Sequence, residues 1–306
     1  MRFRLEELLI RLVLAVVRLM PMPTVRRAGH AIGRLTFHID RFHRRIAREN
    51  LTHAFPSRTP DQIEAIARAM FAHFGAVLLE LLKFGTLTEE DMVRLVDVEG
   101  AERVNQAYQL GRGVLLFTGH FGYWEVHGLM QPLQARRVSV LARPLDNPHL
   151  HEMLERIRRR TGNGVIYRQG AIRKVLRELA ANHGVAMLID QHLHTPDAIY
   201  VDFFGRPAAT TNALAALALR TGAPVIPAFA LPISGGRYRL VYEHPVEPPR
   251  EDTPDAIRDF TQRCTDVLEM YVRRHPELWL WMHRRWRERP EPSLDSGAGH
   301  EVGVDL

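Results

Sequence analysis

The stretch VLLFTGHFGYWE, residues 114–125, contains the pattern that best predicts the fold of this chain. Its first four residues are apolar and predict a buried strand, while Gly119 and Gly122 permit a tight turn after it. A helical pattern follows the turn and continues to about residue 134. A strand, a turn and a helix in this order form one unit of an α/β fold.

The same stretch places a histidine and a carboxylate, His120 and Glu125, five residues apart. Such residues point about 140° apart on a regular helix, so the side chains meet only if His120 lies in the turn and Glu125 begins the helix. A neutral imidazole accepts a proton near pH 7, and a carboxylate on its other nitrogen holds the ring. We therefore predict a hydroxyl-activating pair. The alternative is a loop histidine beside a glutamate that the helix dipole favours.

The chain offers no clear nucleophile of its own. It lacks the Gly-x-Ser-x-Gly pattern of a serine hydrolase, and its only cysteine, Cys264, falls in an amphipathic helical pattern that predicts packing. A single cysteine also excludes an internal disulfide. We therefore expect His120 to activate a hydroxyl of the substrate.

Strands and helices alternate after residue 95. This alternation predicts an α/β fold with a mixed, largely parallel sheet flanked by helices. A Ser-Gly-Gly turn at residues 234–236 predicts a hairpin that leads into the strand 238–242. The other expected strands lie near 113–118, 137–142, 184–190 and 224–231, and the expected helices near 101–110, 123–134, 147–160, 168–182, 210–221 and 254–274.

Upstream of this core, residues 23–95 read as mainly helical, with helices over roughly 24–55 and 60–84. We expect one α/β domain over residues 23–290, made of this helical part and a core over 96–290. The last stretch, 291–306, has a composition that predicts disorder. Within the core, His120, Arg143 and Asp190 each follow a predicted strand, so all three belong at one edge of the sheet.

Residues 1–22 predict an amphipathic helix that associates with a membrane surface. Arg4, Arg11 and Arg18 recur every seven residues along a stripe that lies beside an apolar one. The longest charge-free run, 12–17, is much shorter than the ~20 residues that span a bilayer, which favours lying in the interface. The alternatives are a cleaved signal peptide, which two early glutamates disfavour, and a helix packed on its own domain.

Charge narrows the range of partners. The formal net charge is +6 and arginine supplies nearly all of the positive charge, which suits phosphate and carboxylate ligands. No zinc-finger, RNA-recognition or helix-turn-helix pattern is present, so we expect no nucleic-acid partner. Asp190 is followed by His192 and His194, but these residues lack the further ligands of a metal site, and we predict no metal.

Several ordered blocks resemble the lipid A biosynthesis late acyltransferase family, the lauroyl and myristoyl transferases of Gram-negative bacteria. This family lies within the wider His-x4-Asp/Glu superfamily of lysophospholipid acyltransferase-like enzymes. The blocks are HFGYWE at 120–125, RPLDNP at 143–148, RRR at 158–160, DQ at 190–191, FFG at 203–205, APV at 223–225 and WMHRR at 281–285.

The resemblance implies transfer of a fatty acyl chain from acyl carrier protein, with coenzyme A as the alternative donor, and without a cofactor. The acceptor implied is a hydroxyl of a lipid A precursor at the cytoplasmic face of the inner membrane, reached by a peripheral or monotopic enzyme. His120 and Glu125 fall on the catalytic dyad of the family. The residues implied in binding the substrate or the oxyanion are Arg158, Asp190, Arg143 and Asn147.

These binding residues also have structural readings. Arg158 fits a solvated helix face, and both Asp190 and Asn147 fit helix or turn caps. Tyr123 departs from the asparagine common in the family, and we expect it to bear on acceptor choice. The tryptophans at 279, 281 and 286 fit either an acceptor groove, an interfacial belt or core packing.

Two further functions stay open. Related acyltransferases act on phosphatidylinositol mannosides or on lysophosphatidate, but the lysophosphatidate enzymes carry an Asn-His start to the dyad, whereas Gly119 precedes His120 here. The other is a non-enzymatic scaffold on the membrane surface that inherited the fold. A scaffold has no need to keep His120 and Glu125 in contact.

Overall fold

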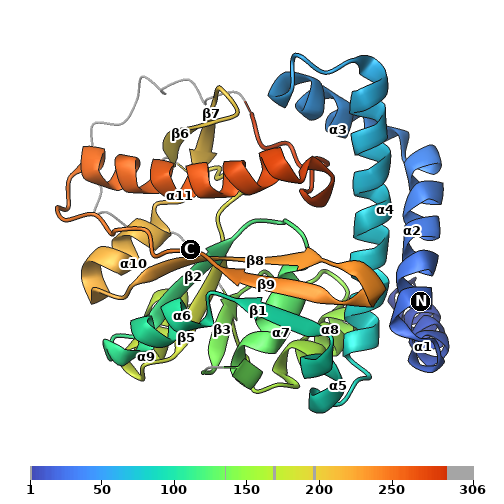
Figure 1. The fold of residues 1–306 in the computed structure, drawn as a ribbon, viewed down its shortest axis with the longest axis horizontal. Helices are drawn as coiled ribbons and strands as arrows, with labels where there is room; N and C mark the ends of the chain where they lie inside the picture. Colours follow the sequence, from blue (N-terminus) through green and yellow to red (C-terminus); the bar gives the residue numbers. More distant parts are fainter. Residues whose placement is uncertain (1, 135, 168–169, 196–197, 288–306) are drawn as a thin grey trace.

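The computed structural model describes residues 2–134, 136–167, 170–195 and 198–287 (Figure 1). The stretch 291–306, predicted to be disordered, lies outside the described residues. A seven-stranded sheet forms the centre of the molecule, in the order β1-β9-β8-β2-β5-β3-β4. Its strands are β1 (Val96–Glu99), β2 (Val114–Thr118), β3 (Val138–Leu141), β4 (Gly164–Ile166), β5 (Gly184–Leu188), β8 (Val225–Pro232) and β9 (Tyr238–Tyr242).

Every neighbouring pair in this sheet is parallel except β8 and β9. The predicted mixed, largely parallel sheet is therefore confirmed, and the turn at Ser234–Gly236 joins β8 and β9 as the hairpin expected. The sequence patterns did not reveal β1 and β4, which are only four and three residues long. They also did not reveal the separate hairpin of β6 (Ile199–Phe203) and β7 (Arg206–Thr210).

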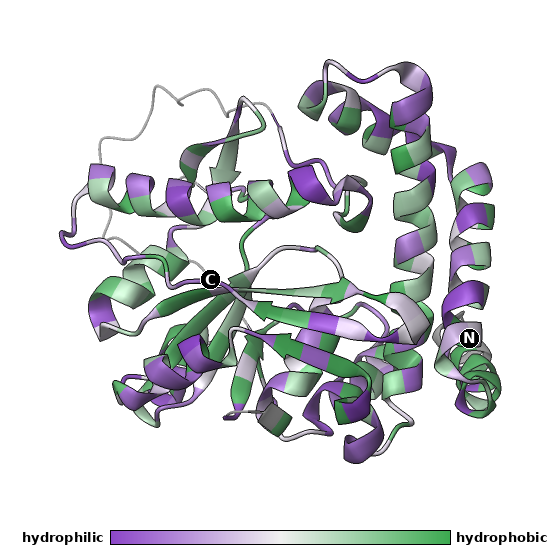
Figure 2. Ribbon diagram, in the orientation of Figure 1, coloured by the Kyte–Doolittle hydropathy of each residue, from purple (hydrophilic) through white to green (hydrophobic). Residues whose placement is uncertain are grey.

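The apolar run at the start of residues 114–125 is strand β2, which lies in the middle of the sheet and is buried throughout. Figure 2 shows hydrophobic residues along the strands at the centre of the sheet. Side chains alternate between its two faces. Leu115 and Phe117 join a core with α10 (Ala213–Thr221) and α11 (Pro254–Arg274), whereas Val114 and Leu116 join one with α6 (Ala101–Gln109). Burial on both faces explains why this strand is continuously apolar. The other helices of the core are α7 (Trp124–Gln134), α8 (Pro148–Arg159) and α9 (Ala171–Ala180).

Five helices precede the sheet: α1 (Arg2–Leu19), α2 (Met22–Ile39), α3 (Arg41–Ala54), α4 (Pro60–Phe84) and α5 (Glu89–Arg94). The helical pattern over 24–55 forms two helices, α2 and α3, because Asp40 divides it. The carboxylate of Asp40 accepts a hydrogen bond from the backbone N–H of His43 at 3.0 Å and thereby begins α3 as its N-cap.

Helices α2 and α4 lie side by side at the edge of the molecule (Figure 1). Three glycines, Gly29 and Gly33 on α2 and Gly75 on α4, allow their backbones to approach. By length and hydropathy α4 could cross a bilayer, but 61% of its apolar segment is buried within the protein. Helix α4 therefore acts as a core helix of this fold.

Helix α1 has two apolar faces, one packed against the domain and one exposed. Val17 is buried, and Ile10, Val13 and Leu14 pack against the same core as α4 and α7. Glu6 accepts a hydrogen bond of 2.8 Å from Asn147, which joins α1 to the start of α8. A second set of apolar side chains on α1 is exposed: Leu8, Leu12, Val16 and Leu19. The structure thus combines packing on the domain with a free apolar face.

Candidate active site

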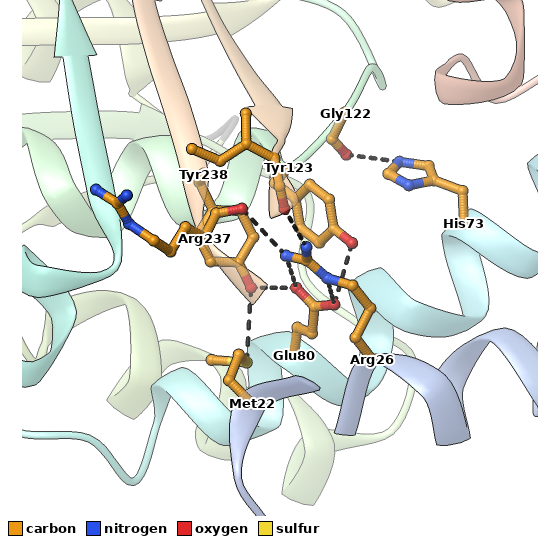
Figure 3. Close-up of polar contacts among 9 residues, drawn as sticks. Met22, Arg26, His73, Glu80, Gly122, Tyr123, Arg237 and Tyr238 are labelled. Atoms are coloured by element: carbon orange, nitrogen blue, oxygen red, sulfur yellow. Dashed lines mark hydrogen bonds and ion pairs between the residues drawn. The ribbon is translucent and has the colours of Figure 1, made fainter. Parts of the chain in front are cut away.

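The turn between β2 and α7 carries His120 and is held from several sides. Figure 3 shows one of these contacts, between Gly122 of the turn and His73. Gly122 has φ +57°, and a Cβ at this position would lie 2.1 Å from the carbonyl oxygen of Ala230, so only glycine fits. Its N–H donates to Leu278 at 2.8 Å, and its carbonyl accepts from Nε2 of His73 at 3.1 Å. Burial lowers the pKa of His73 to about 3, which keeps that ring neutral.

His120 makes its strongest contacts with Asp190. Nδ1 of the ring lies 2.9 Å from Oδ1 of Asp190, and the backbone N–H of His120 donates to Oδ2 at 2.6 Å. Nε1 of Trp279 donates to the same Oδ2 at 2.8 Å. An ionised carboxylate only accepts hydrogen bonds, so Nδ1 carries the proton and the lone pair is on Nε2. Nε2 is therefore the atom that can act as a base.

Sheet register explains this pairing. Strands β2 and β5 are parallel neighbours, with Thr118 opposite Leu188. His120 and Asp190 each come two residues after those partners, so they leave the sheet at the same level. The prediction that both residues lie at one edge of the sheet is confirmed, and the contact that results is closer than the sequence indicated.

The predicted contact between Glu125 and the His120 ring is wrong, because no hydrogen bond joins them. Glu125 lies in the first turn of α7 and faces α8, where Arg158 binds it. Nε of Arg158 donates to Oε2 of Glu125 at 2.9 Å, and a second bond joins Nη2 to Oε1. Both side chains are largely buried, at 16% and 14% exposure. Arg158 is thus not a solvated residue, and the pair forms a bidentate ion pair.

The electrostatics of the site favour a charged imidazole. Burial lowers the pKa of His120, but the charge and hydrogen bond of Asp190 outweigh it, and the charge of Glu125 adds to them, so the pKa lies above its ordinary value of 6.5. Burial raises the pKa of Asp190, but the charge of His120 and the hydrogen bonds it receives lower that pKa to about 2. Asp190 is therefore ionised whenever His120 acts as a base.

A cavity adjoins the catalytic turn between α7, α8 and the strands β2, β3 and β5. Trp124, Glu125 and Arg158 line it, and the ring of Trp124 lies 5.4 Å from that of His120. The ion pair and the base therefore face neighbouring parts of one site. A base can activate a hydroxyl, and a guanidinium fixed by a carboxylate can stabilise an oxyanion, which are two requirements of acyl transfer to a hydroxyl.

Residues 5–288 match the family model of the bacterial lipid A biosynthesis acyltransferases. The chain belongs to this family. The palmitoleoyltransferase of lipid A biosynthesis from Escherichia coli is 27% identical over 89% of this chain and 87% of that protein. The lauroyltransferase from the same organism is 25% identical over 91% and 90%. A phosphatidylinositol mannoside acyltransferase from Mycobacterium tuberculosis is 25% identical over 76% and 72%.

This member of the lipid A acyltransferase family is thus an enzyme that transfers acyl groups. The alternative hypothesis of a non-enzymatic scaffold is therefore rejected. Two further residues that we predicted to bind substrate, Arg143 and Asn147, differ in their surroundings. Arg143 is 89% exposed, with only a 3.9 Å contact to Asp146. Asn147 is buried as the N-cap of α8, where its side chain accepts from the N–H of His149 at 3.0 Å. Its structural reading as a cap is therefore the one observed.

Tyr123, which we expected to bear on acceptor choice, lies in the core of this acyltransferase. Its side chain is fully buried and its hydroxyl donates to Glu80 at 3.1 Å (Figure 3). Trp279 and Trp281 are likewise buried, which confirms core packing for these two. The left-handed conformation of Gly122 turns the chain, so that adjacent side chains point to different parts of the molecule.

The segment 279–286 of the acyltransferase packs against the turn that carries His120, and these contacts were not predicted from the sequence. Leu280 donates its N–H to the carbonyl of His120 at 3.1 Å, and the His283 ring lies 5.2 Å from the His120 ring. Arg285 is 1% exposed and donates to the carbonyl of Gln191 at 3.1 Å. The side-chain amide of Gln191 in turn lies 3.4 Å from Nε2 of His120. The family block at 281–285 and the density of tryptophan and arginine were the signals for this segment in the sequence.

Proposed function

We propose that this enzyme transfers a fatty acyl chain from acyl carrier protein to a hydroxyl group of a lipid A precursor, at the cytoplasmic face of the inner membrane. The observation that carries the proposal is a base, His120, with its Nδ1 held by Asp190, in a chain of the lipid A acyltransferase family. The names of the relatives support the acceptor, since several act in lipid A biosynthesis.

In this mechanism Nε2 of His120 removes the proton from the acceptor hydroxyl. The alkoxide attacks the thioester carbonyl, a tetrahedral oxyanion forms, and the carbon–sulfur bond breaks. The imidazolium then gives its proton to the thiolate, so no net proton is released. Asp190 keeps the ring oriented and stabilises its positive charge.

The oxyanion requires a donor, and Arg158 is suited to this role. Glu125 engages Nε and Nη2 of its guanidinium, whereas Nη1 has no hydrogen-bond partner among the described residues. A guanidinium fixed by a carboxylate stabilises developing negative charge at little reorganisation cost. The second member of the family dyad, Glu125, then acts by holding Arg158 and by raising the pKa of His120 with its charge.

Membrane attachment through α1 belongs to the same proposal. The exposed apolar side chains Leu8, Leu12, Val16 and Leu19 lie on the face of α1 that does not pack on the domain. An amphipathic helix with such a face lies in the headgroup region, where it brings the enzyme to a lipid acceptor.

The test is turnover by the purified full chain with acyl carrier protein thioesters and a lipid A precursor, with the product identified by mass spectrometry. We expect one acyl chain to be added, and His120→Ala to lower the rate by roughly 10²- to 10⁴-fold because the base is lost. His244→Ala is the control, since His244 is an exposed histidine outside the site.

Near-normal turnover of His120→Ala would exclude the proposed base.

A phosphatidylinositol mannoside is the second acceptor to test, because one relative that matches 76% of this chain is named a phosphatidylinositol mannoside acyltransferase. Acylation of the mannoside in place of the lipid A precursor would keep the mechanism and change the acceptor. Replacing acyl carrier protein by coenzyme A in the same assay identifies the donor.

A further inference from the structure

Exposed apolar side chains gather on the second helix as well as on the first. Twelve large apolar side chains are exposed among the described residues, and seven of these lie on α1 and α2, so the distribution is far from even. On α2 they are Ile32, Leu35 and Ile39, which are 50%, 60% and 71% exposed. At helical spacing these three lie within about 60° of one another. We call them the outer face of α2.

Arginines border this outer face. Arg27 and Arg34 are seven residues apart and form a second exposed stripe on α2, and Arg41 is exposed at the start of α3. None of the three forms an ion pair or hydrogen bond with the described residues. Unpaired guanidinium groups beside apolar side chains complement a surface that is apolar below and anionic above. An anionic phospholipid bilayer has this chemistry.

The opposite face of α2 is fixed to the domain. A Cβ on Gly29 would lie 2.5 Å from Cα of Ala76, and one on Gly33 would lie 2.0 Å from the carbonyl oxygen of Phe71. This close backbone contact prevents α2 from turning its outer face inward. Figure 1 shows α1 and α2 at the same edge of the molecule, outside α4. The apolar faces of both helices are therefore available at one edge.

We propose that the outer face of α2 lies on the anionic membrane surface together with α1, so that the enzyme docks with its folded body and not by α1 alone. This inference rests on the proposed membrane location and extends its contact area beyond residue 22. Ile32, Leu35 and Ile39 enter the boundary of the acyl chains, and the arginines extend to the lipid phosphates.

The experiment measures co-sedimentation of the purified full chain with vesicles of phosphatidylglycerol and phosphatidylethanolamine. We expect Leu35→Ser/Ile39→Ser to lower the partition coefficient about ten-fold or more, because two apolar side chains no longer enter the bilayer. Leu35→Ser and Leu110→Ser form a matched pair, since the wild-type side chains are 60% and 61% exposed. Only the first should weaken binding, because Leu110 lies at the end of α6.

Arg27→Gln/Arg34→Gln tests the charge component. This variant should lose binding to the anionic vesicles and bind like wild type to vesicles of phosphatidylcholine alone. Wild-type binding by Leu35→Ser/Ile39→Ser would overturn the proposal, since α1 would then suffice. A change from dimer to monomer in light scattering of the same variant would also overturn it, because a second copy of the chain would cover this face.

The same variant separates this inference from the proposed function. Its turnover with acceptor dissolved in detergent should equal that of wild type, because neither residue touches the catalytic turn. Weakened vesicle binding with unchanged turnover supports the proposal. If the wild-type enzyme binds vesicles through the outer face of α2 but does not acylate a lipid A precursor, the proposed function fails while this inference stands.

Discussion

At the scale of single residues, the carboxylate that serves His120 comes from another strand and not from the same turn. Asp190 lies 70 residues away along the chain, at 2.9 Å from Nδ1. Glu125 is closer in sequence, but its carboxylate is engaged by Arg158. The family motif at 120–125 thus contributes the proposed base and one half of an ion pair, and the carboxylate bound to Nδ1 comes from the Asp-Gln block.

Replacing Asp190 should change the pH dependence of the reaction. Burial lowers the pKa of His120, and Asp190 raises it above 6.5, so the base becomes protonated and inactive as the pH falls through that raised value. Asp190→Asn removes the opposing charge, and the acidic limb of kcat/KM against pH should move to lower pH. The maximal rate should fall roughly 10²- to 10⁴-fold because the ring is no longer held.

Glu125→Gln is the comparison for this experiment, since only the charge of Glu125 acts on the His120 ring. It should move the acidic limb in the same direction and by a smaller amount. An unmoved limb in Asp190→Asn, in a variant that keeps the circular dichroism spectrum of the wild type, would show that Asp190 does not control the base.

At the scale of elements, the association of α2 with α4 depends on residues without side chains. Gly33 faces only backbone atoms of α4: the carbonyl oxygen of Phe71 at 2.0 Å from an added Cβ, and Cα of Ala72 at 2.7 Å. Backbone atoms cannot rotate away as a flexible side chain would. The two helices must therefore separate if a methyl group is placed between them.

Gly33→Ala should accordingly lower the thermal unfolding temperature, with a loss of about 1–3 kcal/mol as for other overpacked sites. Gly128→Ala on α7 is the matched control, because an added Cβ there would meet only Cγ1 of Val140 at 3.7 Å. Alanine also favours the helix, so this control should unfold at the same or a higher temperature. Equal melting of Gly33→Ala and wild type would contradict the close contact.

At the scale of the whole molecule, one buried carboxylate joins the N-terminal helices to the sheet and to the catalytic turn. Glu80 of α4 is fully buried and pairs with Arg26 of α2, whose Nε lies 2.7 Å from Oε1. The hydroxyls of Tyr123 and Tyr238 donate to the same carboxylate (Figure 3). The helical layer and the residue three positions after His120 are therefore held together.

Glu80→Gln should destabilise the whole fold, because it leaves the guanidinium of Arg26 buried without its counter-ion. The expected loss is about 3–5 kcal/mol, measured by chemical denaturation. Glu247→Gln provides the control, since it breaks the exposed pair with Arg250 and should leave the denaturation midpoint almost unchanged. Similar midpoints for the two variants would show that the buried pair does not join the layers.

The amino-acid sequence was sufficient to predict the α/β class, the hairpin at 234–236, the position of His120 after a strand and the family. These follow from local patterns: hydrophobic period, glycine in turns and the order of short motifs. Short strands such as β4 were not predicted, because three residues are too few to show a hydrophobic period.

The contacts between polar groups, in contrast, became apparent only from the three-dimensional fold. The register of β2 against β5 brings Asp190 into contact with His120. The packing of α8 brings Arg158 to Glu125. The fold of residues 279–286 lets Trp279 donate to Asp190 and Arg285 donate to Gln191. The three-dimensional fold also divided the apolar residues of α1 and α2 between the core and the surface. The physical reason is that hydrogen bonds and ion pairs depend on distances in space, and contacts between residues far apart along the chain leave no periodic signal within it.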